Sequence, residues 1–180
     1  MNIKTAIDLY VKEIEDEIEF KEIVKDIVSN KTVQKMKDVP QHYSSNCFDH
    51  CCKVSYYCYK ICKKFNLDYV SAARAGMLHD LYLYNWRDKS IKREGPHAFT
   101  HGRIACRNAC KEFDLNEKEK DMIIKHMWPL TIALPKSIEG FILTFVDKFC
   151  ALQENIDFIS NEKFMRYAYL LLCVFFLRIR

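Results

Sequence analysis

The chain has 180 residues, enough to bury a sizeable hydrophobic core, and it most simply forms one domain. Its four glycines stand apart from one another, which argues against the Gly-rich loops of P-loop and dinucleotide-binding proteins. The formal net charge of +4 is compatible with an anionic small-molecule substrate but is too weak to indicate nucleic-acid binding.

Nine cysteines occur in the chain, and several of them are spaced four residues apart, as on a helix. No secretory signal precedes them, because the N-terminal stretch MNIKTAIDLYVKEIEDE is charged within a few residues. We therefore expect reduced cysteines that pack as small apolar side chains in a cytoplasmic protein. A zinc site built from Cys47, Cys51 and Cys52 is the less favoured alternative, since the chain has no Cys-x-x-Cys pair.

Apolar residues recur at helical spacing through residues 5–29. This pattern predicts one or two amphipathic helices within residues 1–40. Either Asn46 or Ser45 can cap the next helix, which is expected over about residues 48–64.

A third helix is expected to begin after its cap, Asp68, and to run through Leu81. The small residues in its stretch SAARAG allow another helix to approach it closely. The polar connection NWRDKSIKREGPHAF follows. Thr100 can then cap a fourth helix that begins at His101 and runs through Phe113.

The stretch NEKE, in which Asn116 and Glu119 are three residues apart, predicts a capping box at the start of a further helix. That helix should run to about Met127, because Pro129 ends it. After Pro135, the stretch KSIEGFILTFVDKFCALQEN predicts another helix, which carries an aspartate among apolar residues.

The C-terminal stretch MRYAYLLLCVFFLRIR contains an apolar run of about a dozen residues, short of the roughly 20 that a membrane-spanning helix needs. We expect a helix over residues 160–180 that is buried or that faces a partner, such as a second copy in a homo-oligomer. No segment alternates as a strand does. The predicted fold is all-α, a compact helical bundle with a core over about residues 43–154 on which both terminal regions pack.

Six side chains of metal-binding type lie on or beside the predicted helices: His50, His79, Asp80, His101, His126 and Asp147. Each has an ordinary explanation by itself, because a histidine on an apolar face is usually a hydrogen-bonded core residue and an aspartate can cap a turn or pair with a cation. Together, these explanations leave several titratable groups in one core without cations between them. A pair of divalent metal ions would resolve that cost.

The order His…His-Asp…His…His…Asp, with the stretch AARAGMLHD, resembles the HD-domain metal-dependent phosphohydrolase superfamily in its six-ligand, binuclear form. In motif order the chain is similar to the bacterial symmetrical diadenosine tetraphosphate hydrolases, with FTHGRIA, IKHMWPL and VDKFCA at the matching positions. The resemblance implies an all-α fold of the HD type. It also implies that one metal ion is held by His50, His79, Asp80 and Asp147, and a second by His101 and His126, with Asp80 bridging the two.

The resemblance further implies hydrolysis of a phosphate ester or anhydride, with a nucleotide as the expected substrate. Two divalent ions can lower the pKa of a bridging water toward neutrality, position the resulting hydroxide for attack on phosphorus and neutralise charge on the phosphoryl oxygens. Asp80 would then be catalytic as well as a ligand. Nitrogen and oxygen ligands suit Fe, Mn, Co, Ni or Zn, so the pattern leaves the metal open.

Residues that could contact such a substrate are cationic or aromatic and lie near the proposed ligands: Arg87, Lys92, Arg93, Arg103 and Trp128. The first three belong to a connection whose length is typical of functional loops, although their alternative interpretation is a solvated surface. His97 lies four residues before His101, where it could act catalytically by protonating a leaving group, or bind phosphate. Its alternative role is that of a supporting or surface histidine.

One feature departs from the superfamily pattern. Many members have a lysine a few residues after the His-Asp doublet, whereas this chain reads HDLYLYNW, so the diadenosine polyphosphate specificity does not transfer directly. Two other interpretations keep the HD scaffold. Iron-specific activity with oxygen uptake would favour a di-iron oxygenase, and binding without turnover would favour a non-catalytic metal-binding regulatory module.

Overall fold

A computed structural model describes residues 3–41, 46–88, 90–92 and 94–156, and every regular element in these ranges is helical. The all-α prediction is therefore confirmed. The elements are α1 (Ile3–Ser29), α2 (Lys31–Gln34), the 3₁₀ helix η1 (Lys35–Asp38), α3 (Cys47–Lys64), α4 (Tyr69–Leu78), α5 (His97–Glu112), α6 (Glu117–Lys125) and α7 (Ile138–Ile156).

Several predictions fall on residues outside the described ranges. They are the C-terminal helix over residues 160–180 with its role in a homo-oligomer, the alternative cap Ser45 and the proposed substrate residue Arg93. Among the described helices, none combines the length and the hydropathy that crossing a bilayer requires.

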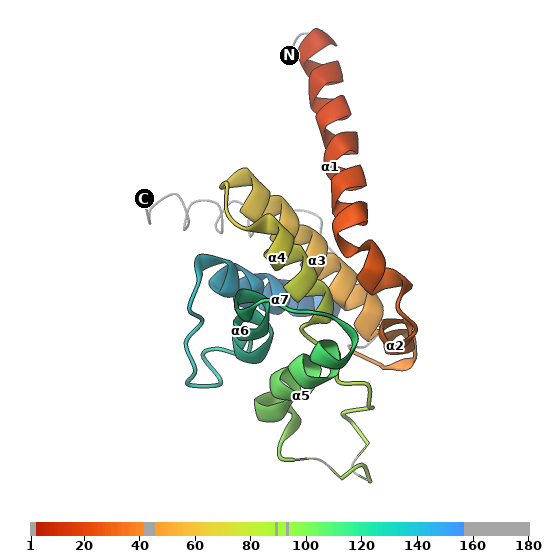
Figure 1. The fold of residues 1–180 in the computed structure, drawn as a ribbon, viewed down its shortest axis with the longest axis vertical. Helices are drawn as coiled ribbons and strands as arrows, with labels where there is room; N and C mark the ends of the chain where they lie inside the picture. Colours follow the sequence, from red (N-terminus) through yellow and green to blue (C-terminus); the bar gives the residue numbers. More distant parts are fainter. Residues whose placement is uncertain (1–2, 42–45, 89, 93, 157–180) are drawn as a thin grey trace.

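α3 and α4 form an antiparallel pair at the centre of the helical body (Figure 1). Their N-termini are capped by Asn46 and Asp68, as predicted. The helices approach closely at Gly76, where an added Cβ would lie 2.7 Å from the Cα atom of Ser55. Across the same contact, the Ser55 hydroxyl donates a hydrogen bond of 2.6 Å to the carbonyl of Ala73. The predicted close approach is confirmed, and it holds the C-terminal end of α4 against α3.

The third helix ends earlier than predicted. α4 stops at Leu78 rather than Leu81, and His79 takes the C-cap position. The N–H of Leu81 donates to the carbonyl of Leu78, so the chain tightens into a turn immediately after the helix. This turn places the His-Asp doublet at the helix end, where the two side chains can point into the core.

The predicted start of the fourth helix is wrong. α5 begins at His97 rather than at His101, and Pro96 occupies the cap position with a φ of −59°. Proline suits this place because its ring fixes a helical φ and the helix start needs no N–H there. The Thr100 hydroxyl bonds back to the carbonyl of Pro96 (3.2 Å) within the first turn instead of capping.

The later helices cover the central pair. α6 begins with the predicted capping box, in which Asn116 and Glu119 each bond the other's backbone N–H. α7 lies behind α3 and α4 in Figure 1 and packs on both of them and on α6. α5 packs on α6 at Gly102, where an added Cβ would lie 2.9 Å from the carbonyl oxygen of Ile123. The helices that carry the predicted ligands thus share one core.

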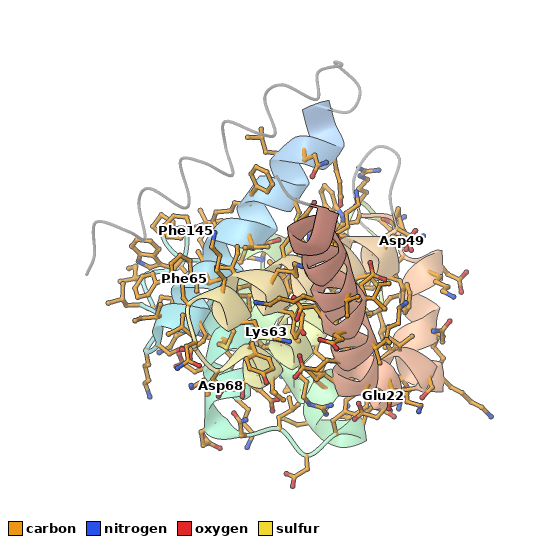
Figure 2. All side chains as sticks on the ribbon, turned by 90° about the horizontal axis from the view of Figure 1, so that it is seen from above. Glu22, Asp49, Lys63, Phe65, Asp68 and Phe145 are labelled. Carbon is orange, nitrogen blue, oxygen red and sulfur yellow. The ribbon has the colours of Figure 1, made fainter. Side chains whose placement is uncertain are left out.

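The C-terminal half of α1 packs on α4, while its N-terminal half extends beyond the helical body (Figure 1). Val24 and Ile27 are buried in this contact region. Near the middle of α1, Asp16 forms an ion pair of 2.7 Å with Lys63 of α3, which lies beside α1 in Figure 2. Asp26 pairs with Arg74 of α4 at 2.8 Å, so ion pairs flank the apolar contact.

Candidate metal centre

All six predicted ligands are buried and come together in the core. Within each of three overlapping groups, one ligand atom per residue lies within 4.8 Å of the others: His50, His79 and Asp80; His79, His126 and Asp147; and Asp80, His101 and His126. α3, α5 and α7 carry one ligand each within their length. The other three follow the last residues of α4 and α6, so five helices deliver the set.

The four histidines present their Nε2 atoms to one another and to the aspartates, because each Nδ1 atom is held on the outside. In three of them Nδ1 lies 2.8 Å from a backbone carbonyl oxygen about one turn earlier: His79 on Gly76, His101 on His97 and His126 on Ile123. A carbonyl oxygen only accepts hydrogen bonds, so each of these Nδ1 atoms carries a proton and leaves the Nε2 lone pair inward. Nδ1 of His50 lies 3.2 Å from a carboxylate oxygen of Glu154.

The histidine Nε2 atoms and aspartate oxygens that face one another are hydrogen-bond acceptors or negatively charged, so a cation between them would stabilise the cluster. His79 Nε2 and Asp80 Oδ1 are buried and have no hydrogen-bond partner within the described chain. The Nε2 atoms of His101 and His126 lie 2.8 Å apart, and Asp80 Oδ1 lies 3.3 and 3.6 Å from them. Asp147 Oδ1 lies 3.1 Å from Nε2 of His50 and 3.4 Å from Nε2 of His79. Imidazole nitrogens and carboxylate oxygens so arranged fit divalent metal ions.

The electrostatics of the cluster differ from one donor to the next. Burial lowers the pKa of His126 to about 3, and the neighbouring His101 and His79 act in the same direction. Burial opposes ionisation of Asp80, but the surrounding imidazoles outweigh it and lower the pKa of this carboxyl below its ordinary value. At His50, burial is outweighed by the carboxylates of Asp147 and Glu154, which raise its pKa to about 10. At neutral pH and without a metal ion, His126 is therefore a neutral imidazole, whereas His50 is protonated and must lose its proton before it can bind a metal ion.

The sequence of residues 47–152, more than half of the chain, matches the HD domain family. The chain belongs to the HD-domain family. HD domains bind divalent metals, and the family is of the metal-dependent hydrolase type. Membership in it suggests a small-molecule substrate. All six predicted ligands lie within the matched stretch. Comparisons with curated proteins and with solved structures found no match.

Three residues that support this HD-domain site were missed in the sequence: Gln41, Tyr82 and Glu154. Gln41 donates a hydrogen bond of 2.6 Å from its amide to Asp80 Oδ2, and Tyr82 donates to the amide oxygen of Gln41. Glu154 follows Asp147 by two helical turns on α7, so helical periodicity could have found it. Gln41 precedes Asp80 by 39 residues and carries no periodic signal.

His97 lies at the edge of the cluster. It is half-buried, its ring stacks on that of His101 with 4.5 Å between centroids, and its Nδ1 lies 3.0 Å from the Tyr84 hydroxyl oxygen. Its ring also stacks on Trp86 at 5.6 Å, an aromatic partner that the sequence interpretation did not include. The structure thus places this predicted catalytic residue directly beside one of the predicted ligands.

Of the other predicted substrate residues within the described ranges, three are exposed and one is half-buried. Arg87 is exposed and lies over the Trp86 ring, with 5.0 Å to its centroid. Lys92 and Arg103 are exposed. Trp128 is half-buried and packs edge-on against Phe141 and Phe145, with 5.5 and 6.5 Å between the ring centroids.

The alternative zinc site on α3 finds no support in the geometry. None of the metal-capable groups among the described residues includes a cysteine. Cys47 donates from its sulfur to the backbone carbonyl of Asp80 (3.2 Å), and Cys51 Sγ lies 3.7 Å from His79 Nδ1. Burial raises the pKa of Cys52 to about 11 and that of Cys51 well above its ordinary value, so these groups stay thiols. Cys51 packs behind His79, and the half-buried Cys52 lies against Met77, with 3.7 Å between the sulfur atoms.

Proposed function

We propose that this HD-domain protein is a phosphohydrolase that cleaves a phosphate ester or anhydride, with a nucleotide as its expected substrate. The proposal rests on one observation: three groups of ligand atoms overlap, because His79, Asp80 and His126 each belong to two of them. One continuous cluster thus offers donors for two divalent ions. The first would be held by His50, His79, Asp80 and Asp147, and the second by His101 and His126 together with Asp80.

Two divalent ions bound there would supply an activated water as the nucleophile and would neutralise charge on the phosphoryl oxygens. The chain itself contributes orientation. Backbone carbonyls and Glu154 hold the outer nitrogens of the histidines, which fixes both the tautomer and the direction of each ring. Burial of all six side chains keeps bulk water from competing for these donors.

We assign His97 the role of proton donor to the leaving group. Its ring is held between Trp86 and His101, and the Tyr84 hydroxyl holds its Nδ1 (3.0 Å), so its position beside the cluster is fixed. The exposed cations Arg87, Lys92 and Arg103 and the half-buried Trp128 remain our candidates for contacting the substrate, as does Arg93 from outside the described residues.

Replacing His97 with alanine is expected to lower kcat about 10²- to 10⁴-fold for a substrate with a poor leaving group, such as a nucleoside monophosphate. An aryl phosphate with an acidic phenol needs no proton on its leaving group, so its hydrolysis should fall far less. Parallel assays of both substrates, with bound metal quantified, measure this difference. Phe99→Ala, at an exposed site on the same helix, is the control. An equal loss on both substrates would contradict the proton-donor role.

The proposed function is tested by assaying the full chain loaded with Mn²⁺ or Fe²⁺ against nucleotides, dinucleoside polyphosphates and aryl phosphates. We expect phosphate ester or anhydride cleavage that disappears on chelation and returns on adding metal. Oxygen uptake with iron and no hydrolysis would instead identify an oxygenase. Nucleotide binding with full metal occupancy and no turnover would identify a regulatory module. Either result would overturn the proposal.

A further inference from the structure

A buried amide lies against the carboxylate that the proposed metal groups share. Gln41 is 8% exposed, and its amide nitrogen donates a hydrogen bond of 2.6 Å to Oδ2 of Asp80. The other oxygen, Oδ1, remains directed at the Nε2 atoms of His101 and His126, at 3.3 and 3.6 Å. Oδ2 also lies 3.6 Å from Nε2 of His79. The rotation of the Asp80 carboxylate therefore determines which of its oxygens lies beside His79 and which lies beside His101 and His126.

The direction of the Gln41 amide is itself fixed. A carboxylate can only accept hydrogen bonds, so the amide must present its nitrogen to Asp80. Its oxygen is then turned the other way, where it accepts the hydroxyl proton of Tyr82. Tyr82 is 2% exposed, and its ring packs edge-on against His97 with 4.7 Å between centroids. The nitrogen and the oxygen of the buried amide thus each have a hydrogen-bond partner, and a 180° flip of the amide would lose both bonds.

The segment that carries Gln41 is anchored at the start of α3. The N–H of Cys47 donates to the carbonyl of Val39 at 2.9 Å, and Pro40 forms an antiparallel bridge with Asn46. The sulfur of Cys47 then bonds the backbone carbonyl of Asp80 at 3.2 Å. One short stretch holds both the backbone and the side chain of Asp80. Gln41 lies before residues 47–152, the stretch that matches the HD domain.

From this geometry we propose that Gln41 is a positioning residue that fixes the rotation of the Asp80 carboxylate, and that Tyr82 acts through Gln41. One carboxylate oxygen is held beside His79 and the other beside His101 and His126, so both metal groups receive an oxygen without rearrangement. The inference rests on the proposed metal site but not on hydrolytic activity. It assigns the segment before the HD domain a part in building the site.

Replacing Gln41 with leucine keeps the bulk of the side chain but removes both polar ends. We expect the dissociation constant of Mn²⁺ for the weaker site to rise about 10- to 100-fold, as is typical when a group that orients a metal ligand is lost. Tyr82→Phe removes only the hydroxyl and should cause a smaller rise. The Gln41→Leu/Tyr82→Phe double variant should match Gln41→Leu, because the hydroxyl has no amide left to hold. Mn²⁺ titration calorimetry and the absorption spectrum of the Co²⁺-loaded proteins provide the readouts.

Gln34→Leu is the matched control, since it also removes a glutamine amide that donates a hydrogen bond, here to the carbonyl of Val28 (2.5 Å), away from the cluster. It should lower thermal stability without changing Mn²⁺ affinity or the Co²⁺ spectrum. Unchanged affinity and spectrum in Gln41→Leu and Tyr82→Phe would overturn the inference, as would additive effects in the double variant. Absence of metal binding by the wild-type chain would overturn the proposed metal site as well. Metal binding that weakens in Gln41→Leu without any hydrolysis by the wild type would overturn only the proposed hydrolase function.

Discussion

Asp80→Asn is expected to lower metal-dependent phosphate release about 10³-fold or more, because it removes the charged donor that the proposed metal groups share. Gln41 donates to Oδ2 of Asp80, so the oxygen of the new amide would face Gln41. Its NH₂ group would then point toward His101 and His126, where a cation would have to bind. Phosphate release and bound metal should be measured on the same preparation. We expect both to fall, with the loss of at least one equivalent of bound metal.

The matched control is Asp49→Asn, which makes the same chemical change at an exposed residue next to His50. It should retain full metal content and activity. Asp80→Asn should also keep the far-UV circular dichroism of the wild type, because Asp80 follows α4 and the substitution changes neither the volume nor the helix interior. Retained turnover in Asp80→Asn with full metal content would show that this carboxylate is not shared between two reacting ions.

The helices were predictable because their signals are local. Apolar spacing predicted residues 5–29 and the structure shows α1 over Ile3–Ser29, and the caps Asn46, Asp68 and Asn116 lie where their side chains can accept backbone N–H groups. The start of α5 was misplaced because both Pro96 and Thr100 can begin a helix. In the structure the helix begins after Pro96, whose ring fixes the backbone φ, and the Thr100 hydroxyl instead donates a hydrogen bond to the carbonyl of Pro96 within the first turn.

The candidate site was predictable only in part. The order of histidines and aspartates pointed to the six buried residues, and the structure brings them together. Gln41 and Tyr82 were not predictable, because an amide and a phenol have many roles and the 39 residues between Gln41 and Asp80 carry no spacing rule. Trp86 was missed for a related reason. Its contact with His97 depends on the path of the connection before α5, and the spacing of apolar residues does not predict the path of a connection.

Gly76→Val is expected to lower the free energy of unfolding by about 3 kcal/mol, because the added side chain has no space between α3 and α4. A Cβ at this position would already lie 2.7 Å from Cα of Ser55 and 3.1 Å from its backbone nitrogen, and backbone atoms cannot turn away as a side chain can. Gly76→Ala is the graded variant. Its overlap should cost roughly 1–3 kcal/mol, partly offset by the gain of about 1 kcal/mol that alanine brings to a helix.

The same substitutions should weaken metal binding, because Gly76 lies one turn before His79 and its carbonyl holds the Nδ1 atom of that ring. Moving α4 away from α3 separates His79 and Asp80 from His50, which α3 carries. Urea unfolding followed by circular dichroism, together with Mn²⁺ titration, measures both effects. Val70→Ala, at an exposed position on α4, reports the helix propensity alone and should leave metal affinity unchanged. A Gly76→Val variant that unfolds at the wild-type urea concentration would show that the two helices can separate there without cost, and the close packing of α3 on α4 could no longer explain how the doublet is held against His50.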